Sequence, residues 1–345
     1  MGYDNPQDNV QAAEDYYASH ADVRDVTGNE VNNVFASSLS PEAIPSLTKL
    51  PRESRDVRGK PKSLNSVIIV DDTDSMDEIL SWLISNGLES IAVKALNAVK
   101  NHDFQVLFGF INDIRAYCDN PLQIGQFEAG FGQMMQQLRS FKRQGNGGGN
   151  GFEGYSIAYH FAAKHTEADA FTKRGEKGLF ICIGDDACTN FTQYERELVY
   201  GKNNLNSIRG TLSESEIINM ASQKYVCYQI IVPGYAYFHH GDYVLRQWRR
   251  LLGNHAIFLG IPEDLRRYDV DELMKYDRPK RLMKSLPDLI TTLFLMRDGL
   301  SKTQAISQIE DFENRRSVTL ALKDHEEYMD YTVRNHSVPK SIETF

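Results

Sequence analysis

The sequence is poor in cysteine, in long apolar runs and in excess basic charge. Its 345 residues include four cysteines, none of them in a C-x-x-C pair or at a Cys/His spacing typical of zinc, so neither a disulfide framework nor a zinc module is predicted. No apolar run reaches the length of about 18 residues that a membrane-spanning helix needs. The net charge of −9 argues against a general nucleic-acid binder, which normally presents a basic face.

The amino-terminal residues also lack the features of a secretory signal. The stretch MGYDNPQDNV has neither a basic start nor an apolar segment, so we expect a cytoplasmic protein without a membrane partner. Residues 1–62 are polar, follow no regular apolar period and carry several prolines in their second half. This composition indicates an extended arm that is disordered or wraps around a neighbouring molecule.

Residues 63–262 alternate between short apolar runs and amphipathic segments. The apolar content of 41% and the charged content of 25% are those of an ordinary globular protein. The alternation predicts a doubly wound, mostly parallel α/β sheet with helices on both faces. Strands are expected at residues 67–70, 104–111, 179–184, 225–232 and 256–259, with a short edge strand within 122–128.

Residues 263–345 are charged and predict a helical extension that ends in a polar tail. Helices are expected at residues 271–276, 286–296 and 303–312, and the segment LPDLITTLFLM is apolar enough to pack on the main domain. Gly87 interrupts the amphipathic pattern that begins at Met76, so the helix there is expected to divide in two.

The stretch Ser66–Met76, SVIIVDDTDSM, is the strongest functional signal in the chain. A buried strand runs directly into oxygen-bearing side chains, among them Asp71, Thr73 and Ser75 in the spacing D-x-T-x-S. A third strand, LFICIG, ends in Asp185. Ligands of open α/β sheets bind at the carboxyl ends of the strands, and hard oxygen donors there suit Mg²⁺ or Ca²⁺.

At these residues the chain resembles a von Willebrand factor A (vWA) domain with its metal-ion-dependent adhesion site (MIDAS). The resemblance covers residues 63–262, where VIIVDDTDSM and ICIGD match the first and third loops of the family's site. Within the family, AYCDNPLQIGQFE, GGGNGFEGYSIAYHFAAKH and IGDD look like a bacterial and phage branch. It implies a Rossmann-like fold and a site for Mg²⁺, Mn²⁺ or Ca²⁺ at Asp71, Thr73, Ser75 and Asp185.

The sequence departs from the family in the second loop of the site. Gly149 stands where the family has a threonine, and Asn150 or Glu153 would have to supply the missing oxygen. These motifs have two simpler interpretations. In the first, Thr73 or Asp74 serves only as a helix N-cap. In the second, the turn GNGGGNG binds a phosphate, but it lacks the Gly-Lys-Ser/Thr ending of a nucleotide-binding loop.

The resemblance implies a protein-binding module, in which a partner's Asp or Glu completes the coordination of the metal. An adaptor for a MoxR-type AAA+ ATPase is one role that it suggests. The alternative is a structural or assembly protein of a phage particle or large complex. Such a protein would self-associate through the amino-terminal arm, and its metal would have only a structural role.

Enzymatic activity is not expected. Asp72, Asp113 or Asp186 would be available as a base beside a metal-bound water. However, no second set of metal ligands and no Ser-His or Cys-His spacing accompanies them.

Overall fold

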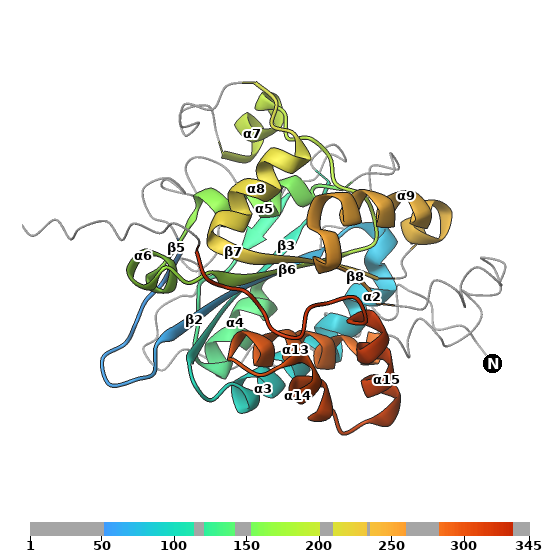
Figure 1. Ribbon diagram of the computed structural model, residues 1–345. Coiled ribbons are helices and arrows are strands. Elements are labelled where there is room, and N and C mark those ends of the chain that lie inside the picture. The colour runs from blue at the N-terminus through green and yellow to red at the C-terminus, as the bar shows by residue number, and fades with distance from the viewer. Residues whose placement is uncertain are drawn as a thin grey trace, which may run out of the picture.

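The computed structural model describes residues 52–113, 121–141, 153–200, 210–232, 235–259 and 283–333 (Figure 1). Several predicted features lie outside these residues: the arm as far as residue 51, the glycine-rich turn with Gly149 and Asn150, the helix at 271–276 and the tail beyond residue 333.

A six-stranded sheet forms the centre of the described part of the chain. Its strand order is β4-β3-β2-β6-β7-β8, and only the edge strand β4 is antiparallel to its neighbour. The α/β class and the mostly parallel sheet expected from the sequence are therefore confirmed. The strands are β2 (Ser63–Asp71), β3 (Asp103–Ile111), β4 (Leu122–Ile124), β6 (Gly178–Gly184), β7 (Tyr225–Ile231) and β8 (Ala256–Phe258).

Helices cover both faces of this sheet because successive strand residues point to opposite sides. On one face, Ile68 and Val70 pack with α2 (Asp77–Trp82), α3 (Leu88–Ala98), α4 (Phe131–Ser140) and α13 (Leu286–Arg297). On the other face, Val67 and Ile69 pack with α5 (Tyr155–Lys164), α8 (Glu214–Lys224) and α9 (Tyr235–Leu252) (Figure 1). Every residue of β2 is buried, as expected for the central strand of a covered parallel sheet.

The helical segment after β2 is divided, as predicted from the position of Gly87. A 3₁₀ turn, η2 (Asp74–Met76), leads into α2, and a π-helical segment, η3 (Leu83–Gly87), separates α2 from α3. A Cβ atom at Gly87 would lie 2.8 Å from side-chain atoms of both Leu83 and Trp82. The glycine therefore permits a close approach that any larger residue would push apart.

The last residues of the predicted arm pair with the domain itself. β1 (Arg52–Ser54) forms a small parallel sheet with β5 (Thr166–Ala168), which leads into α6 (Asp169–Arg174). Both carboxylate oxygens of Asp56 accept hydrogen bonds from Arg174 Nη1 at 2.8 Å. These strands are three polar or small residues long, so apolar periodicity could not predict them.

The prediction of one helix at residues 303–312 is wrong. The structure has two helices there, α14 (Lys302–Ser307) and α15 (Phe312–Ala321). Ser301 and Gln304 form a capping box at the start of α14, and the Asp311 side chain caps α15 by accepting from the Asn314 N–H. The second cap starts a new helix at the position where the sequence pattern predicts the end of the first.

Two further elements differ from expectation. The sequence pattern predicts a helix at residues 243–252, but α9 begins earlier, at Tyr235, and is followed by the 3₁₀ turn η5 (Gly253–His255). α7 (Gln193–Tyr200) was not predicted. Among the described residues, every helix is too short or too polar to cross a membrane.

Candidate metal centre

The oxygens of the D-x-T-x-S loop form one continuous chain with Asp185. The Thr73 N–H and hydroxyl both donate to Asp71 Oδ1, at 2.9 and 2.7 Å. The Thr73 and Ser75 hydroxyl oxygens lie 3.2 Å apart, and Ser75 donates to Asp185 Oδ1 at 2.9 Å. The four residues meet because β2 and β6 are parallel neighbours, so both strands deliver their carboxyl ends to the same edge of the sheet.

Thr73 also stands at the N-cap position of η2, but its side chain makes no capping hydrogen bond. Its hydroxyl turns back to Asp71 instead. The interpretation of Thr73 as only a helix cap therefore lacks the side-chain hydrogen bond that defines such a cap.

Glu153 brings a further carboxyl group to this buried edge. Its N–H donates to the Ala187 carbonyl at 3.1 Å, which ties it to the loop after β6. The residue is 7% exposed, and its Oε2 has no hydrogen-bond partner among the described residues. Burial, together with repulsion from Asp71, Asp113, Asp186 and Asp185, raises the pKa of Glu153 to about 11.

Tyr155 holds the second oxygen of Asp71. Its hydroxyl donates to Asp71 Oδ2 at 2.5 Å and accepts from the Asp186 N–H at 3.3 Å. Burial raises the pKa of Asp71 to about 6, although the hydrogen bonds from Tyr155 and Thr73 act in the opposite direction. A Cβ atom at Gly184 would lie 2.1 Å from the Tyr155 hydroxyl, so this glycine makes room for the contact.

The electrostatics of this cluster would suit a bound cation. Asp71, Thr73 and Asp185 are fully buried, and Ser75 is half-buried. Carboxylates gathered in a dry site repel one another and hold protons above their usual range unless a positive charge compensates them. The donors are oxygens only, which suits Mg²⁺, Ca²⁺ or Mn²⁺.

The structure thus gathers Asp71, Thr73, Ser75 and Asp185, and it places Glu153 among their carboxyl neighbours. Asn150, the other candidate for the missing oxygen, lies outside the described residues. The sequence does not predict the contact of Tyr155 with Asp71. A tyrosine on the apolar face of a helix carries no local signal of a bond to an aspartate 84 positions earlier.

Comparisons with known proteins leave the function open. No family model matches the chain, and no curated protein matches it. Solved structures that resemble it include the pilus adhesin SpaC from Lactobacillus rhamnosus GG in an open conformation, with a TM-score of 0.40, 12% identity, and coverage of 67% of this chain and 31% of the adhesin. A second structure of that adhesin gives a TM-score of 0.39, 11% identity and coverage of 67% and 32%. The chain spans about a third of the adhesin's length, and similarity at this level carries no argument about function.

Proposed function

We propose that this protein is a vWA-type, doubly wound binding module that uses a divalent cation to capture an acidic side chain of a partner protein. Asp71, Thr73, Ser75 and Asp185 would hold Mg²⁺, or Mn²⁺ or Ca²⁺ in its place. The observation that supports the proposal best is the unbroken chain of four oxygens from two strand ends beside the unpartnered carboxyl oxygen of Glu153.

The spacing of these oxygens fits a small cation. Mg²⁺ binds oxygens at about 2.1 Å in an octahedron, so adjacent ligands lie roughly 3 Å apart. The successive separations along the chain, 2.7, 3.2 and 2.9 Å, are of that size. These hydrogen bonds would therefore give way to metal ligation with little movement of the side chains.

The neighbouring residues would have distinct parts in such a site. Tyr155 fixes the carboxylate plane of Asp71 through Oδ2 and leaves Oδ1 toward the hydroxyls. Glu153 can supply an oxygen where Gly149 offers none. A partner carboxylate that completes the coordination forms a charge-assisted contact, which adds specificity to a modest interface. A MoxR-type AAA+ ATPase remains a candidate partner through the resemblance alone.

The burial of the cluster favours a second candidate, in which the metal is only a structural staple of an assembly protein. Asp71 and Asp185 are fully buried, and Glu153 is an internal carboxyl group of the kind that a partner would otherwise donate. In that case partner capture would not depend on the metal. In either case the proposal is a non-enzymatic protein.

Metal-dependent capture can be tested with three proteins: the wild type, Asp71→Ala and the control Asp74→Asn. Asp74 lies in the same turn, but its side chain is exposed and outside the oxygen chain. Calorimetric titration with Mg²⁺ should show binding to the wild type and to Asp74→Asn only. Partners captured by cross-linking in Mg²⁺ should then be lost both with chelator and in Asp71→Ala. Capture that persists in chelator would refute the adhesion role, and the absence of Mg²⁺ binding would refute both candidates.

A further inference from the structure

A second group of metal-ligating side chains lies away from the candidate metal centre. His255 ends η5, directly before the amino end of β8, whereas Asp71 and Asp185 lie at the carboxyl ends of β2 and β6. His325 and Glu326 come from the segment after α15, about 70 positions later in the chain. The described residues contain no other group of three or more His, Cys, Asp or Glu side chains with ligand atoms this close together.

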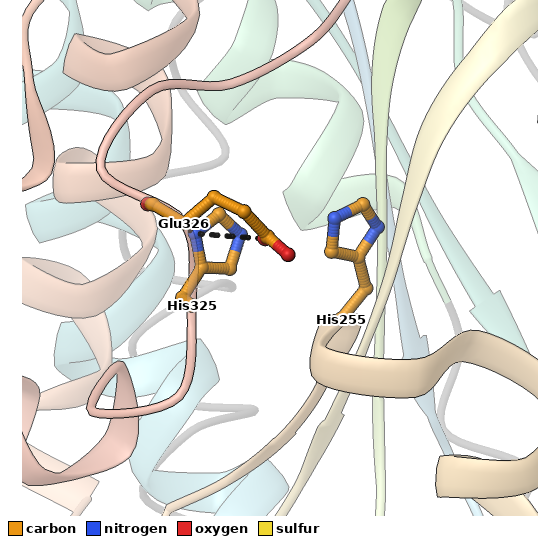
Figure 2. A group of neighbouring side chains, drawn as sticks. All are labelled: His255, His325 and Glu326. Carbon is orange, nitrogen blue, oxygen red and sulfur yellow. Dashed lines mark hydrogen bonds and ion pairs between the residues drawn. The ribbon is translucent and has the colours of Figure 1, made fainter.

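The side chains of this group converge. One ligand atom from each residue lies within 4.8 Å of the other two. The two imidazole rings are 5.3 Å apart and nearly parallel, with an interplanar angle of 17°. Figure 2 shows the Glu326 carboxylate reaching into the space between the rings, and Glu326 Oε2 lies 4.0 Å from His325 Nδ1.

Each side chain is also oriented by a neighbour outside the group. His255 donates a hydrogen bond to the Cys227 backbone, so its other ring nitrogen remains as an acceptor. The Glu326 carboxylate accepts from the Asn254 side chain. Metal-binding histidines and carboxylates are usually held by outer partners of this kind, which fix the ring tautomer and the direction of the lone pair.

His325 can present a lone pair by giving up one of its two hydrogen bonds and keeping the other. Its Nε2 lies 2.8 Å from the Tyr228 hydroxyl, and its Nδ1 lies 2.9 Å from the Glu326 carbonyl oxygen. A carbonyl only accepts, so Nδ1 carries the proton in this arrangement. Because the Tyr228 hydroxyl can donate or accept, moving the proton to Nε2 keeps the tyrosine contact and frees Nδ1 for a metal.

We propose that His255, His325 and Glu326 bind a first-row transition ion of the Zn²⁺ class, with water as the fourth ligand, and that the ion fastens the carboxyl-terminal segment to the β7–β8 edge of the sheet. Two imidazoles and one carboxylate are donors typical of Zn²⁺ and unsuited to Mg²⁺. Burial lowers the pKa of His255 to about 4 and lowers that of His325, so both rings are neutral and able to coordinate at pH 7.

The required rearrangement is small and falls mainly on the exposed side chain of Glu326. Ligand nitrogens and oxygens around tetrahedral Zn²⁺ lie roughly 3.3 Å apart at bond lengths of about 2.0–2.1 Å. The side chains therefore have to close in by at most about 1.5 Å. Glu326 is exposed and His255 half-buried, so the carboxylate can move and solvent gives the ion access.

The test titrates the protein with Zn²⁺ or with Co²⁺. The buffer contains millimolar Mg²⁺, which occupies the oxygen site. The variants are Glu326→Gln and His255→Gln, and the control is Glu313→Gln, which alters an exposed glutamate of α15. We expect one equivalent of Zn²⁺ to bind to the wild type and the control, and tetrahedral Co²⁺ absorption to appear in both. Each of the other two variants should bind more than about 100-fold more weakly, which exceeds the 10–100-fold loss typical of outer-shell changes.

Stability gives a second measure that does not depend on the spectrum. Zn²⁺ should raise the melting temperature of the wild type and of Glu313→Gln but not that of the ligand variants, which should melt like the wild type in chelator. The proposal is overturned if the wild type takes up no Zn²⁺, or if either ligand variant binds it as tightly as the control. Asp71→Ala should still bind Zn²⁺, so failure of the oxygen site would be seen separately.

Discussion

Exchange of Glu153 for glutamine should stabilise the protein in the absence of metal and reduce the stability that Mg²⁺ adds. The glutamate is 7% exposed, has one unpartnered carboxyl oxygen and lies among four other carboxyl groups. Glutamine has nearly the same shape as protonated glutamate but no titratable proton. Glu153→Gln therefore separates the charge of this residue from its packing.

The size of the effect follows from the pKa. Burial and repulsion raise the pKa of Glu153 from 4.5 to about 11, so the folded, metal-free protein keeps this proton at pH 7 while the unfolded chain loses it. A raised pKa of an acid contributes stability below pH 4.5, and this contribution is lost as the pH rises toward 11. At pH 7 the loss is about 3 kcal/mol, with a slope of about 1.4 kcal/mol per pH unit.

In chelator at pH 7, Glu153→Gln should therefore melt roughly 5–10 °C higher than the wild type. Its stability should also fall less steeply between pH 5 and pH 8 than that of the wild type. In Mg²⁺ at 100 times the dissociation constant, the wild type should gain about 2.7 kcal/mol and the variant much less, because an amide oxygen is a weaker ligand than a carboxylate.

Thermal melting by circular dichroism in chelator and in Mg²⁺, at several pH values, measures all of these differences. Glu313→Gln, which changes an exposed glutamate, serves as the control for the chemical exchange itself. A variant that melts below the wild type in chelator at pH 7 would refute the reasoning, because the carboxyl group would then stabilise the metal-free fold.

The remaining predictions concern the same site and the carboxyl-terminal helices. Asp71→Ala should abolish the melting shift of roughly 5–10 °C that Mg²⁺ gives the wild type, whereas Asp74→Asn should keep it; an equal shift in both variants would place the metal elsewhere. Tyr155→Phe removes a hydrogen bond that lowers the pKa of Asp71, so the pKa of Asp71 should rise above 6. Mg²⁺ titrations between pH 6 and 7 should then show weaker binding to the variant. Unchanged binding across that range would exclude a role for the Tyr155 hydroxyl in metal binding. Ser301→Ala breaks the capping box of α14 and should cost about 1 kcal/mol in urea unfolding, whereas Ser307→Ala, at the exposed end of the same helix, should cost much less.

The sheet could be predicted well because its signals are local. β3 and β7 are continuous apolar runs, and their observed ends lie within one residue of the predicted ones. β1 and β5 carry no such run and exist only because they pair with each other across more than 100 positions. The prediction of one helix at residues 303–312 is wrong for another reason, because the Asp311 cap interrupts an otherwise helical composition.

Those residues of the candidate metal centre that lie at the carboxyl ends of strands could be predicted from the sequence. Asp71 ends β2 and Asp185 directly follows β6, and the parallel pairing of these two strands brings the side chains together. Tyr155 could not be assigned in this way, because its contact depends on the packing of α5 against the sheet. His255 and His325 are farther still from any local pattern, because their approach depends on the packing of the carboxyl-terminal segment against Tyr228 of β7 and against η5.

The burial of α13 constrains the order in which this protein can fold during synthesis. All twelve of its residues are buried, and it packs against α3, which lies about 190 positions earlier. A growing chain that has completed all six strands of the sheet therefore still exposes the apolar side of α3 to water. Since chains emerge at about 5–20 residues per second, that side stays open for several seconds after β8 has left the ribosome. During this interval the nascent protein is most prone to aggregation, and a chaperone has a defined apolar surface to cover.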